Sequence, residues 1–405
     1  MAVATLFDSI KRDPWIRLSI GLWIVFVLVI AAMTLSQPLR SLTPLYQQSA
    51  MDFWIGRREP LDFGQGFYYL PASRILYSPF ALLGVAVGGL LWRLVGFALI
   101  TLSAWRWADL LTPRFVDRCF ATILILMIPA SAGALRNGQF DAPVWPLMAL
   151  AAAAVAGGAW WRAAALLGLA LALKPTAIVA ALLVGAVWPQ VGLRLLPIAV
   201  VILAIPYANP RWGYVSQLYG DLLQQFLGAV ANPGRKEDLA NALMVVGAPI
   251  PARAMTVLRV FAAIGILALA LAAARRVTRI EAAFVALMLT VVYLLLFNPR
   301  TEGTSYMALA LVAAPISARL ALLERRPALS AVTAAIAILP GVVGLTPFTM
   351  RVLDLWMDPL LACVFFVTAA IPRALVPSAW TIRNPLALAG QAGDEAGERD
   401  LRPSR

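Results

Sequence analysis

Long apolar runs recur along the whole of this 405-residue chain, and they constrain its fold more than any other feature. The runs cover residues 18–36, 85–105, 120–135, 144–158, 195–207, 257–274, 282–297, 307–323, 329–345 and 360–371. Several of them reach the roughly 18–20 residues that a helix needs to cross about 30 Å of hydrocarbon. An outer-membrane β-barrel would alternate apolar and polar residues instead. The sequence therefore predicts an all-α polytopic membrane protein.

The composition agrees with a location in the membrane. The chain is 61% hydrophobic and 13% charged, whereas a soluble domain is roughly half apolar and a quarter charged. A net charge of +13 would suggest nucleic-acid binding in a soluble protein. Here the arginines cluster at the ends of the apolar runs and set orientation, so we expect membrane lipids and no nucleic acid as partners. With no histidine, and with Cys119 and Cys363 inside apolar segments, the sequence implies neither a metal site nor a cofactor.

The first apolar run follows a basic segment, an arrangement that secretory signal peptides share. The run of about 18 residues is longer than the apolar part of a typical signal peptide. We therefore expect an uncleaved first helix with a cytoplasmic N-terminus.

Clusters of arginine then mark further cytoplasmic turns. The clusters are Arg106, Arg114 and Arg118, then Arg275, Arg276 and Arg279, then Arg325 and Arg326. Their parity places both termini in the cytoplasm. We expect one transmembrane domain at 1–375, with long outer loops at 37–84 and 209–254. Residues 376–405 form a polar cytoplasmic tail that the composition predicts to be disordered.

Lys174 is one of only three lysines, and it stands inside the apolar segment 167–186. Arg162 and Arg194 both fit a cytoplasmic location, so the 31 residues between them have to cross the membrane and return. This length is too short for two full spans. Because Pro175 disfavours a helix at the residue before it, the sequence predicts two short helices, 163–173 and 176–188, that meet at Lys174.

A broken helix is tolerated in a membrane only where it packs in protein or lines a wet cavity. We therefore expect Lys174 in an outer cavity, as a functional residue. The alternative is that its side chain only extends to the outer headgroups.

The polar surface of the chain lies in the outer loops, because the cytoplasmic loops are short and contain no P-loop, Rossmann or DxD pattern. The two long outer loops are rich in aromatic residues, which predicts helices lying in the membrane interface. The alternative is that these loops only cap the bundle. The short outer loop "RNGQFDA" adds a polar cluster at the mouth of two helices, namely Arg136, Asn137, Gln139 and Asp141.

The turn "FNPRTEG" is the most informative outer loop. Arg300 presents a fork that suits phosphate or carboxylate, and Glu302 beside it can stay ionised and act as a base. The alternative is a local Arg–Glu pair without chemistry. Cations and carboxylates on one outer side suit a phosphate headgroup that carries a polyhydroxylated group. The candidate binding residues are Lys174, Arg300, Arg136, Asn137, Gln139, Tyr68 and Tyr69.

Three segments in this order resemble the bacterial family 87 membrane glycosyltransferases of the GT-C class. They are "RNGQFDAPVWPLMALAAAA", "WWRAAALLGLALALKPTAIVAALL" and "YLLLFNPRTEGTSYMALALVAAP". The resemblance extends over roughly residues 15–375. It implies a GT-C-like bundle of about 11–12 membrane helices, some of them short or broken. It also implies a bacterial inner-membrane protein whose site faces the exterior, a polyprenyl-phosphate sugar as donor, and a glycan or lipid as acceptor. Mannose and arabinofuranose are the typical sugars.

The chain departs from the family pattern at two positions. Thr43 stands where members carry an acidic residue after the first helix, and "PRTEG" stands where many carry a histidine. Candidates to replace the acidic residue are Asp52, Glu59 and Asp62, and Glu302 is the candidate to replace the histidine.

The favoured function is therefore a polyprenyl-phosphate-sugar glycosyltransferase, a hexosyl- or pentosyltransferase. Glu302 would deprotonate the acceptor hydroxyl, with Asp52 and Asp62 as competing bases, and Lys174, Arg300 and Arg136 would hold the phosphate without a metal. The lipid tail would lie near residues 68–80. A lipid-linked-sugar flippase or other transporter is the first alternative, and a non-catalytic partner in an envelope-glycan complex is the second.

Overall fold

Helices form all of the regular secondary structure in the part of the chain that the structure, a computed structural model, describes. That part comprises residues 9–58, 69–231, 236–343, 346, 348–349, 353 and 355–380. The helices are α2 (Pro14–Ser36), α3 (Thr43–Ile55), α4 (Pro71–Ala81), α5 (Gly84–Leu111), α6 (Val116–Asn137), α7 (Asp141–Ala156), α8 (Trp160–Leu173), η1 (Pro175–Ala177), α9 (Ile178–Val187), α10 (Pro189–Ala204), η2 (Ile205–Ala208), α11 (Trp212–Ala231), α12 (Leu239–Val245), α13 (Ala252–Arg276), α14 (Arg279–Phe297), η3 (Gly303–Tyr306), α15 (Met307–Leu322), α16 (Pro327–Val343), α18 (Met357–Phe365), η4 (Phe366–Ala370), α19 (Ile371–Leu375) and η5 (Pro377–Trp380).

The membrane part of the fold consists of long and short apolar helices. Among the described residues, eight helices are long and apolar enough to cross a membrane, and four further apolar helices are shorter. The short ones are α7, α8, η1 with α9, and α16. These findings confirm the polytopic all-α class and the expected mixture of full-length and short helices.

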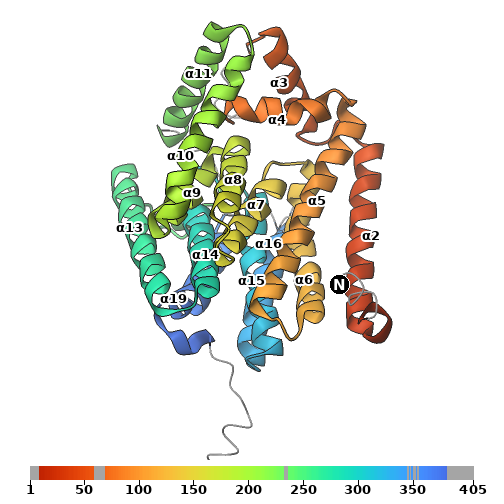
Figure 1. The fold of residues 1–405 in the computed structure, drawn as a ribbon, viewed down its shortest axis with the longest axis vertical. Coiled ribbons are helices and arrows are strands. Elements are labelled where there is room, and N and C mark those ends of the chain that lie inside the picture. Colours follow the sequence, from red (N-terminus) through yellow and green to blue (C-terminus); the bar gives the residue numbers. More distant parts are fainter. Residues whose placement is uncertain are drawn as a thin grey trace, which may run out of the picture.

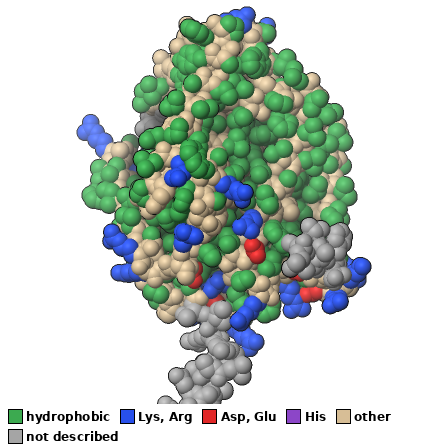
Figure 2. Space-filling view, in the orientation of Figure 1, with side chains coloured by type: hydrophobic (Ala, Val, Ile, Leu, Met, Phe, Trp, Pro, Cys, Tyr) green, Lys and Arg blue, Asp and Glu red, His purple; other side chains and the backbone are tan. Residues whose placement is uncertain are grey.

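The centre of the bundle consists of α7, α14 and α15. Every residue of α7 is buried, and 89% of the apolar window of α15 is buried inside the protein. In α10 and α13 the buried share is only 17%, which fits helices that face lipid. Hydrophobic side chains accordingly cover much of the flank of the molecule (Figure 2). The alanine-rich sequence of α7 lets its neighbours approach closely, as is usual in membrane bundles.

The two ends of the bundle are named from the orientation that the arginines predict. The inner end is the one where α2 begins, at the lower side of Figure 1, and the last described helix returns to it. The outer end is the opposite one, where α3, α4 and α11 gather. Both long outer loops therefore contain helices, as expected.

The two long outer loops pack against each other. Phe53 of α3 is fully buried with Val215 and Leu218 of α11. The side-chain amide of Asn209 donates a 2.6 Å hydrogen bond to the carbonyl oxygen of Phe53. The guanidinium of Arg58 makes two hydrogen bonds to the carboxylate of Asp221. The outer loops thus form one folded unit above the bundle.

A buried charge cluster closes the inner end. Glu324 accepts a 2.9 Å hydrogen bond from Nε of Arg319, and its other oxygen lies 3.6 Å from Arg373. Arg319 also donates to the carbonyl oxygen of Trp380. The guanidinium groups of Arg319 and Arg373 lie over the buried ring of Trp380. Ordered structure therefore continues to Trp380, beyond residue 375, where we expected the tail to begin. The rest of that tail, 381–405, lies outside the described residues.

Candidate functional site

Lys174 lies at a break between two short helices. Helix α8 ends at Leu173, the backbone of Lys174 is extended, with φ −142° and ψ 119°, and η1 begins at Pro175. This geometry confirms the predicted break, and its cause is the steric effect of proline on the preceding residue.

The ammonium group of Lys174 is held by Asp141. Its Nζ lies 2.8 Å from Oδ1 and 2.7 Å from Oδ2 of this carboxylate. Asp141 is the first residue of α7, and its Oδ1 also accepts a 2.9 Å hydrogen bond from the indole of Trp145. The side chains of Lys174 and Asp141 are only 19% and 5% exposed. The ammonium group of Lys174 is thus paired with a buried carboxylate of the protein.

A second lysine–carboxylate pair lies beside the first. Nζ of Lys236 is 2.9 Å from Oε1 of Glu302, and the amide nitrogen of Gln139 is 3.5 Å from Oε2. Gln139 is two residues before Asp141, so the loop between α6 and α7 contacts both pairs. We did not select Lys236 from the sequence. The available signal was that lysine is rare in this chain, and that two of its three lysines fall in or beside outer segments.

The segment that carries Lys236 is fixed to the turn that carries Glu302. The backbone N–H of Glu237 donates a 3.0 Å hydrogen bond to the carbonyl oxygen of Thr301. The hydroxyl of Tyr306 donates a 2.9 Å bond to the carbonyl oxygen of Glu237. A Cβ at Gly303 would lie 2.6 Å from the Glu237 carboxylate, so a side chain there would displace the end of Glu237. The Lys236–Glu302 pair is therefore part of a packed contact between two loops.

Electrostatics keep Glu302 ionised. Partial burial raises the pKa of Glu302, but the nearby charge of Lys236, its hydrogen bond, and the charges of Lys174 and Arg300 together lower the pKa below its ordinary value. The side chain is still 49% exposed. A carboxylate that is ionised and reachable from solvent can accept a proton or repel an anion, and the two lysines decide which anions can approach.

An aromatic cluster adjoins the charged pairs. The rings of Tyr46 and Tyr69 each lie 4.6 Å from the ring of Phe140, and their hydroxyl oxygens are 3.3 Å apart. Tyr69 lies near enough to Lys174 for the ammonium charge to act on its phenol group. Aromatic faces beside hydrogen-bonding groups suit the apolar and polar faces of a sugar ring. Tyr68, the other predicted tyrosine, lies outside the described residues.

An apolar groove runs along α8 between α4 and α10. Its volume is about 350 Å³, and its lining includes Ala72, Leu76, Leu169, Ala172, Ile198 and Ile202. Ala172 is two residues before Lys174, and Ala72 is three residues after Tyr69. The lining of the groove therefore includes residues that stand two or three positions from Lys174 and Tyr69.

Comparison with known proteins assigns the sequence to a family. The sequence model of glycosyltransferase family 87 matches residues 67–299, which is more than half of the chain. The chain belongs to glycosyltransferase family 87. No curated protein and no solved structure matches it. The family 87 match includes Asp141, Lys174 and Lys236, whereas Asp52 and Glu302 lie outside the matched range.

The remaining predicted residues of this glycosyltransferase have different surroundings. Arg136 is exposed, and among the described residues no hydrogen bond or ion pair involves its side chain. Its carbonyl oxygen instead accepts a 2.8 Å bond from the buried Arg93, and the carbonyl oxygen of Asn137 accepts a 3.0 Å bond from the N–H of Leu42. The carbonyl oxygens of Arg136 and Asn137 therefore tie the end of α6 to its neighbours.

The two acidic candidates in the first outer loop also differ. Asp52 is buried in α3, 3.8 Å from Arg57, and its Oδ1 has no hydrogen-bond partner among the described residues. Asp62 lies outside the described residues, as does Glu59. Thr43, at the position where the resemblance implies an acid, is buried with its hydroxyl 3.5 Å from Arg93. Arg93 was not selected from the sequence. A Cβ at position 138 would lie 3.0 Å from its buried guanidinium, and the φ of +65° at Gly138 favours glycine there.

Proposed function

We propose that this family 87 glycosyltransferase transfers a mannose- or arabinose-like sugar from a polyprenyl-phosphate donor to a glycan or lipid acceptor. The observation that carries the proposal is that Lys174, paired with Asp141, stands two residues after Ala172 in the lining of the apolar groove. A lipid-linked sugar phosphate has the same succession of parts, because its anionic group joins a long apolar chain to a polar sugar.

The groove fits the lipid chain of such a donor. It follows α8, whose 14 residues span about 21 Å at 1.5 Å per residue. Exposed Leu169 and Val201 line it together with buried Ala172. Each methylene of a bound chain that leaves water contributes about 0.8 kcal/mol, although this gain is absent for a chain that arrives from lipid. The groove would therefore select lipid chains by their shape. A chain bound in it would have its phosphate near Lys174.

The phosphate would be held by cations. Lys174 points its ammonium toward Asp141 at the outer end, and Arg300 and Lys236 lie in the loops around Glu302. Cations arranged before the reaction stabilise the charge that develops on a departing phosphate. In this proposal an incoming phosphate shares Lys174 with Asp141.

Glu302 would act as the base. It is ionised, half exposed and next to the Lys174 pair through Gln139, so an acceptor hydroxyl can approach it from the outer side. Asp52 and Asp62 remain its competitors, and the burial of Asp52 makes it the less accessible of the two described carboxylates.

We also propose that the site faces the exterior of a bacterial inner membrane and that both termini are cytoplasmic. Most of the visible Lys and Arg side chains lie on the lower half of Figure 2, toward the inner end, which supports this orientation by the positive-inside rule. Single cysteines introduced at Arg211 and Ser378 in a Cys119→Ala, Cys363→Ala background test it. Labelling at 211 alone in intact spheroplasts is expected, and labelling at 378 alone would reverse the orientation.

The activity is tested by incubating the purified full chain with short-chain polyprenyl-phosphate mannose or arabinofuranose and measuring release of polyprenyl phosphate. Breakdown of one donor that requires an added glycan or lipid acceptor is the expected result. Donor binding without breakdown for every sugar would favour the non-catalytic partner. Movement of intact donor across vesicles that contain the protein would favour the flippase.

A further inference from the structure

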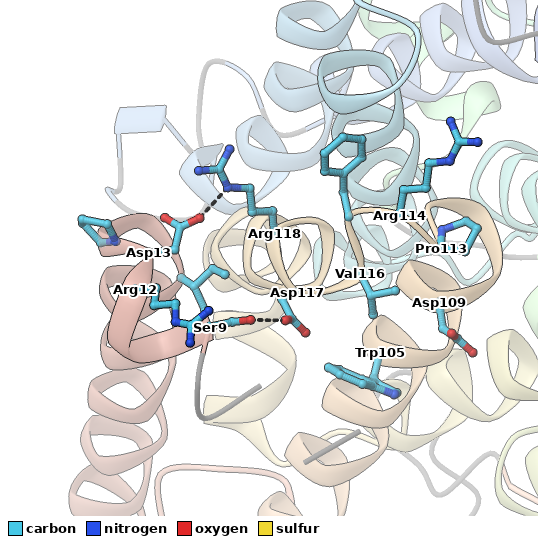
Figure 3. A pocket seen from close by; sticks show the side chains of 13 residues that line it. Ser9, Arg12, Asp13, Trp105, Asp109, Pro113, Arg114, Val116, Asp117 and Arg118 are labelled. Atoms are coloured by element: carbon cyan, nitrogen blue, oxygen red, sulfur yellow. Dashed lines mark hydrogen bonds and ion pairs between the residues drawn. The ribbon is translucent and has the colours of Figure 1, made fainter. Parts of the chain in front are cut away.

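A pocket of about 910 Å³ lies at the inner end, away from the charged pairs of the outer end. It forms where α2 begins, α5 ends and α6 begins, and Figure 3 shows the side chains that line it. Each of these three helices is long and apolar enough to cross a membrane. The pocket therefore lies at the boundary between the apolar part of the protein and water.

The charges in the pocket are of both signs, and some are already paired. Asp13 accepts a hydrogen bond from Arg118, and Asp109 lies 3.0 Å from Arg106. Arg12 and Arg114 have no ion pair or hydrogen bond with a described residue. Asp117 accepts a hydrogen bond from the hydroxyl of Ser9 but forms no ion pair within the described chain (Figure 3).

Arg12 and Asp117 both line the pocket, and Ser9 links the segments that carry them. Ser9 and Arg12 are three residues apart in one helical segment, so they share a face. Since Ser9 bonds to Asp117, the guanidinium of Arg12 lies on the side of the pocket where Asp117 offers its carboxylate. A cation and a carboxylate that face the same pocket without pairing suit a ligand that has an anionic group next to a cationic one.

The surroundings indicate that this ligand is a lipid. Trp15 and Leu18 of α2 follow the pocket directly and are both exposed, so an apolar surface continues from it along the helix. Trp105 lines the pocket itself, and tryptophan is typical of the depth at which headgroups lie. A water-soluble ligand would have no use for this continuous apolar surface.

We propose that the pocket binds the headgroup of a zwitterionic phospholipid that carries a primary ammonium group, such as phosphatidylethanolamine. The phosphate contacts Arg12, the ammonium donates to Asp117, and the acyl chains lie along the exposed face of α2. Arg114 adds positive charge at the rim. This binding site is independent of the proposed glycosyl transfer.

The test uses the purified full chain in detergent with dihexanoyl phosphatidylethanolamine, phosphatidylcholine and phosphatidylglycerol, and native mass spectrometry to count bound lipids. One bound ethanolamine lipid is expected, with an affinity about tenfold higher than that of the choline lipid, because a quaternary ammonium cannot donate a hydrogen bond. Equal binding of the three lipids, or tightest binding of the glycerol lipid, would overturn the proposal.

Two variants locate the site. Asp117→Asn keeps an acceptor for Ser9 and should reduce the ethanolamine lipid to the affinity of the choline lipid. Arg12→Gln should weaken both lipids by about tenfold. Arg17→Gln removes an exposed arginine of α2 that does not line the pocket and should change neither. Unchanged selectivity in a folded Asp117→Asn protein contradicts the proposal. If that variant does not fold, unchanged binding by Arg12→Gln contradicts it instead.

Discussion

The ammonium group of Lys174 lies within 2.8 Å of both carboxylate oxygens of Asp141, although the two residues stand 33 positions apart in an otherwise apolar region. The pair neutralises two charges that the bundle could not hold singly. It also leaves Lys174 able to exchange part of its contact with Asp141 for a phosphate, which makes the pair the centre of the proposed donor site.

Lys174→Met is expected to abolish measurable donor binding and to destabilise the protein. The substitution leaves Asp141 buried without its cation, and breaking a buried pair in this way costs about 3–5 kcal/mol. Donor binding by isothermal titration and thermal unfolding in detergent measure the two effects.

The double variant Lys174→Met, Asp141→Asn separates these effects. Asparagine keeps an oxygen for the indole of Trp145 and removes the unpaired charge, so most of the stability should return. Donor affinity should stay lost. If the double variant binds donor as well as the unchanged protein, Lys174 only supports the fold.

The sequence predicted the helices of this region well because the signals were local. Pro175 disfavours helix at Lys174, and the 31 residues between Arg162 and Arg194 are too few for two full spans. The pairing of charges was not predictable in the same way. Lys236 and Glu302 are 66 positions apart. Their contact depends on how the segment before α12 packs against the turn between α14 and η3. The packing of the Arg136 backbone was equally unpredictable, since its carbonyl oxygen accepts a hydrogen bond from Arg93, which is 43 positions earlier in the chain.

Glu302→Gln should lower turnover by about 10²- to 10⁴-fold if Glu302 is the general base. Stability should hardly change, because an ion pair with a half-exposed carboxylate contributes only about 0–1 kcal/mol. The measurement is the initial rate of donor consumption, and Asp52→Asn and Asp62→Asn are measured in parallel. Near-normal turnover in Glu302→Gln, together with loss in either aspartate variant, would assign the base to the first outer loop.

The pH dependence of turnover should report the Lys236–Glu302 contact. Lys236 lowers the pKa of Glu302, so the acid limb of the rate profile should lie below the ordinary glutamate value of about 4.3. Lys236→Met should move that limb to higher pH. The effect on stability has the same sign, since a lowered pKa contributes stability above the ordinary value, and this is lost as the pH falls through the folded-state value. An unshifted limb in Lys236→Met would mean that the rate depends on another group.

Filling the apolar groove should discriminate between donors by chain length. Leu169→Trp places a larger side chain in the groove, and KM for a long-chain donor should rise about tenfold, because overpacking a filled site costs about 1–3 kcal/mol. A donor with a very short chain should be unaffected. Leu182→Trp on α9 changes another exposed leucine, which lies outside the groove, and serves as the control. Equal effects of both substitutions would place the lipid chain elsewhere.

The buried cluster at the inner end should contribute strongly to stability and not to catalysis. Glu324 is the only described carboxylate that pairs with Arg319 and Arg373, so Glu324→Gln leaves two buried cations without a counter-charge. We expect a loss of about 3–5 kcal/mol in the free energy of unfolding, seen as a large drop in the unfolding midpoint in detergent.

Asp109→Asn breaks an exposed pair at the same end and should cost about 0–1 kcal/mol. At temperatures where Glu324→Gln is still folded, its turnover should be normal, because the cluster lies at the end of the bundle opposite Lys174. If the unfolding midpoint of Glu324→Gln falls no further than that of Asp109→Asn, the two arginines find other partners. If the folded Glu324→Gln protein turns over more slowly, the two ends of the bundle are coupled.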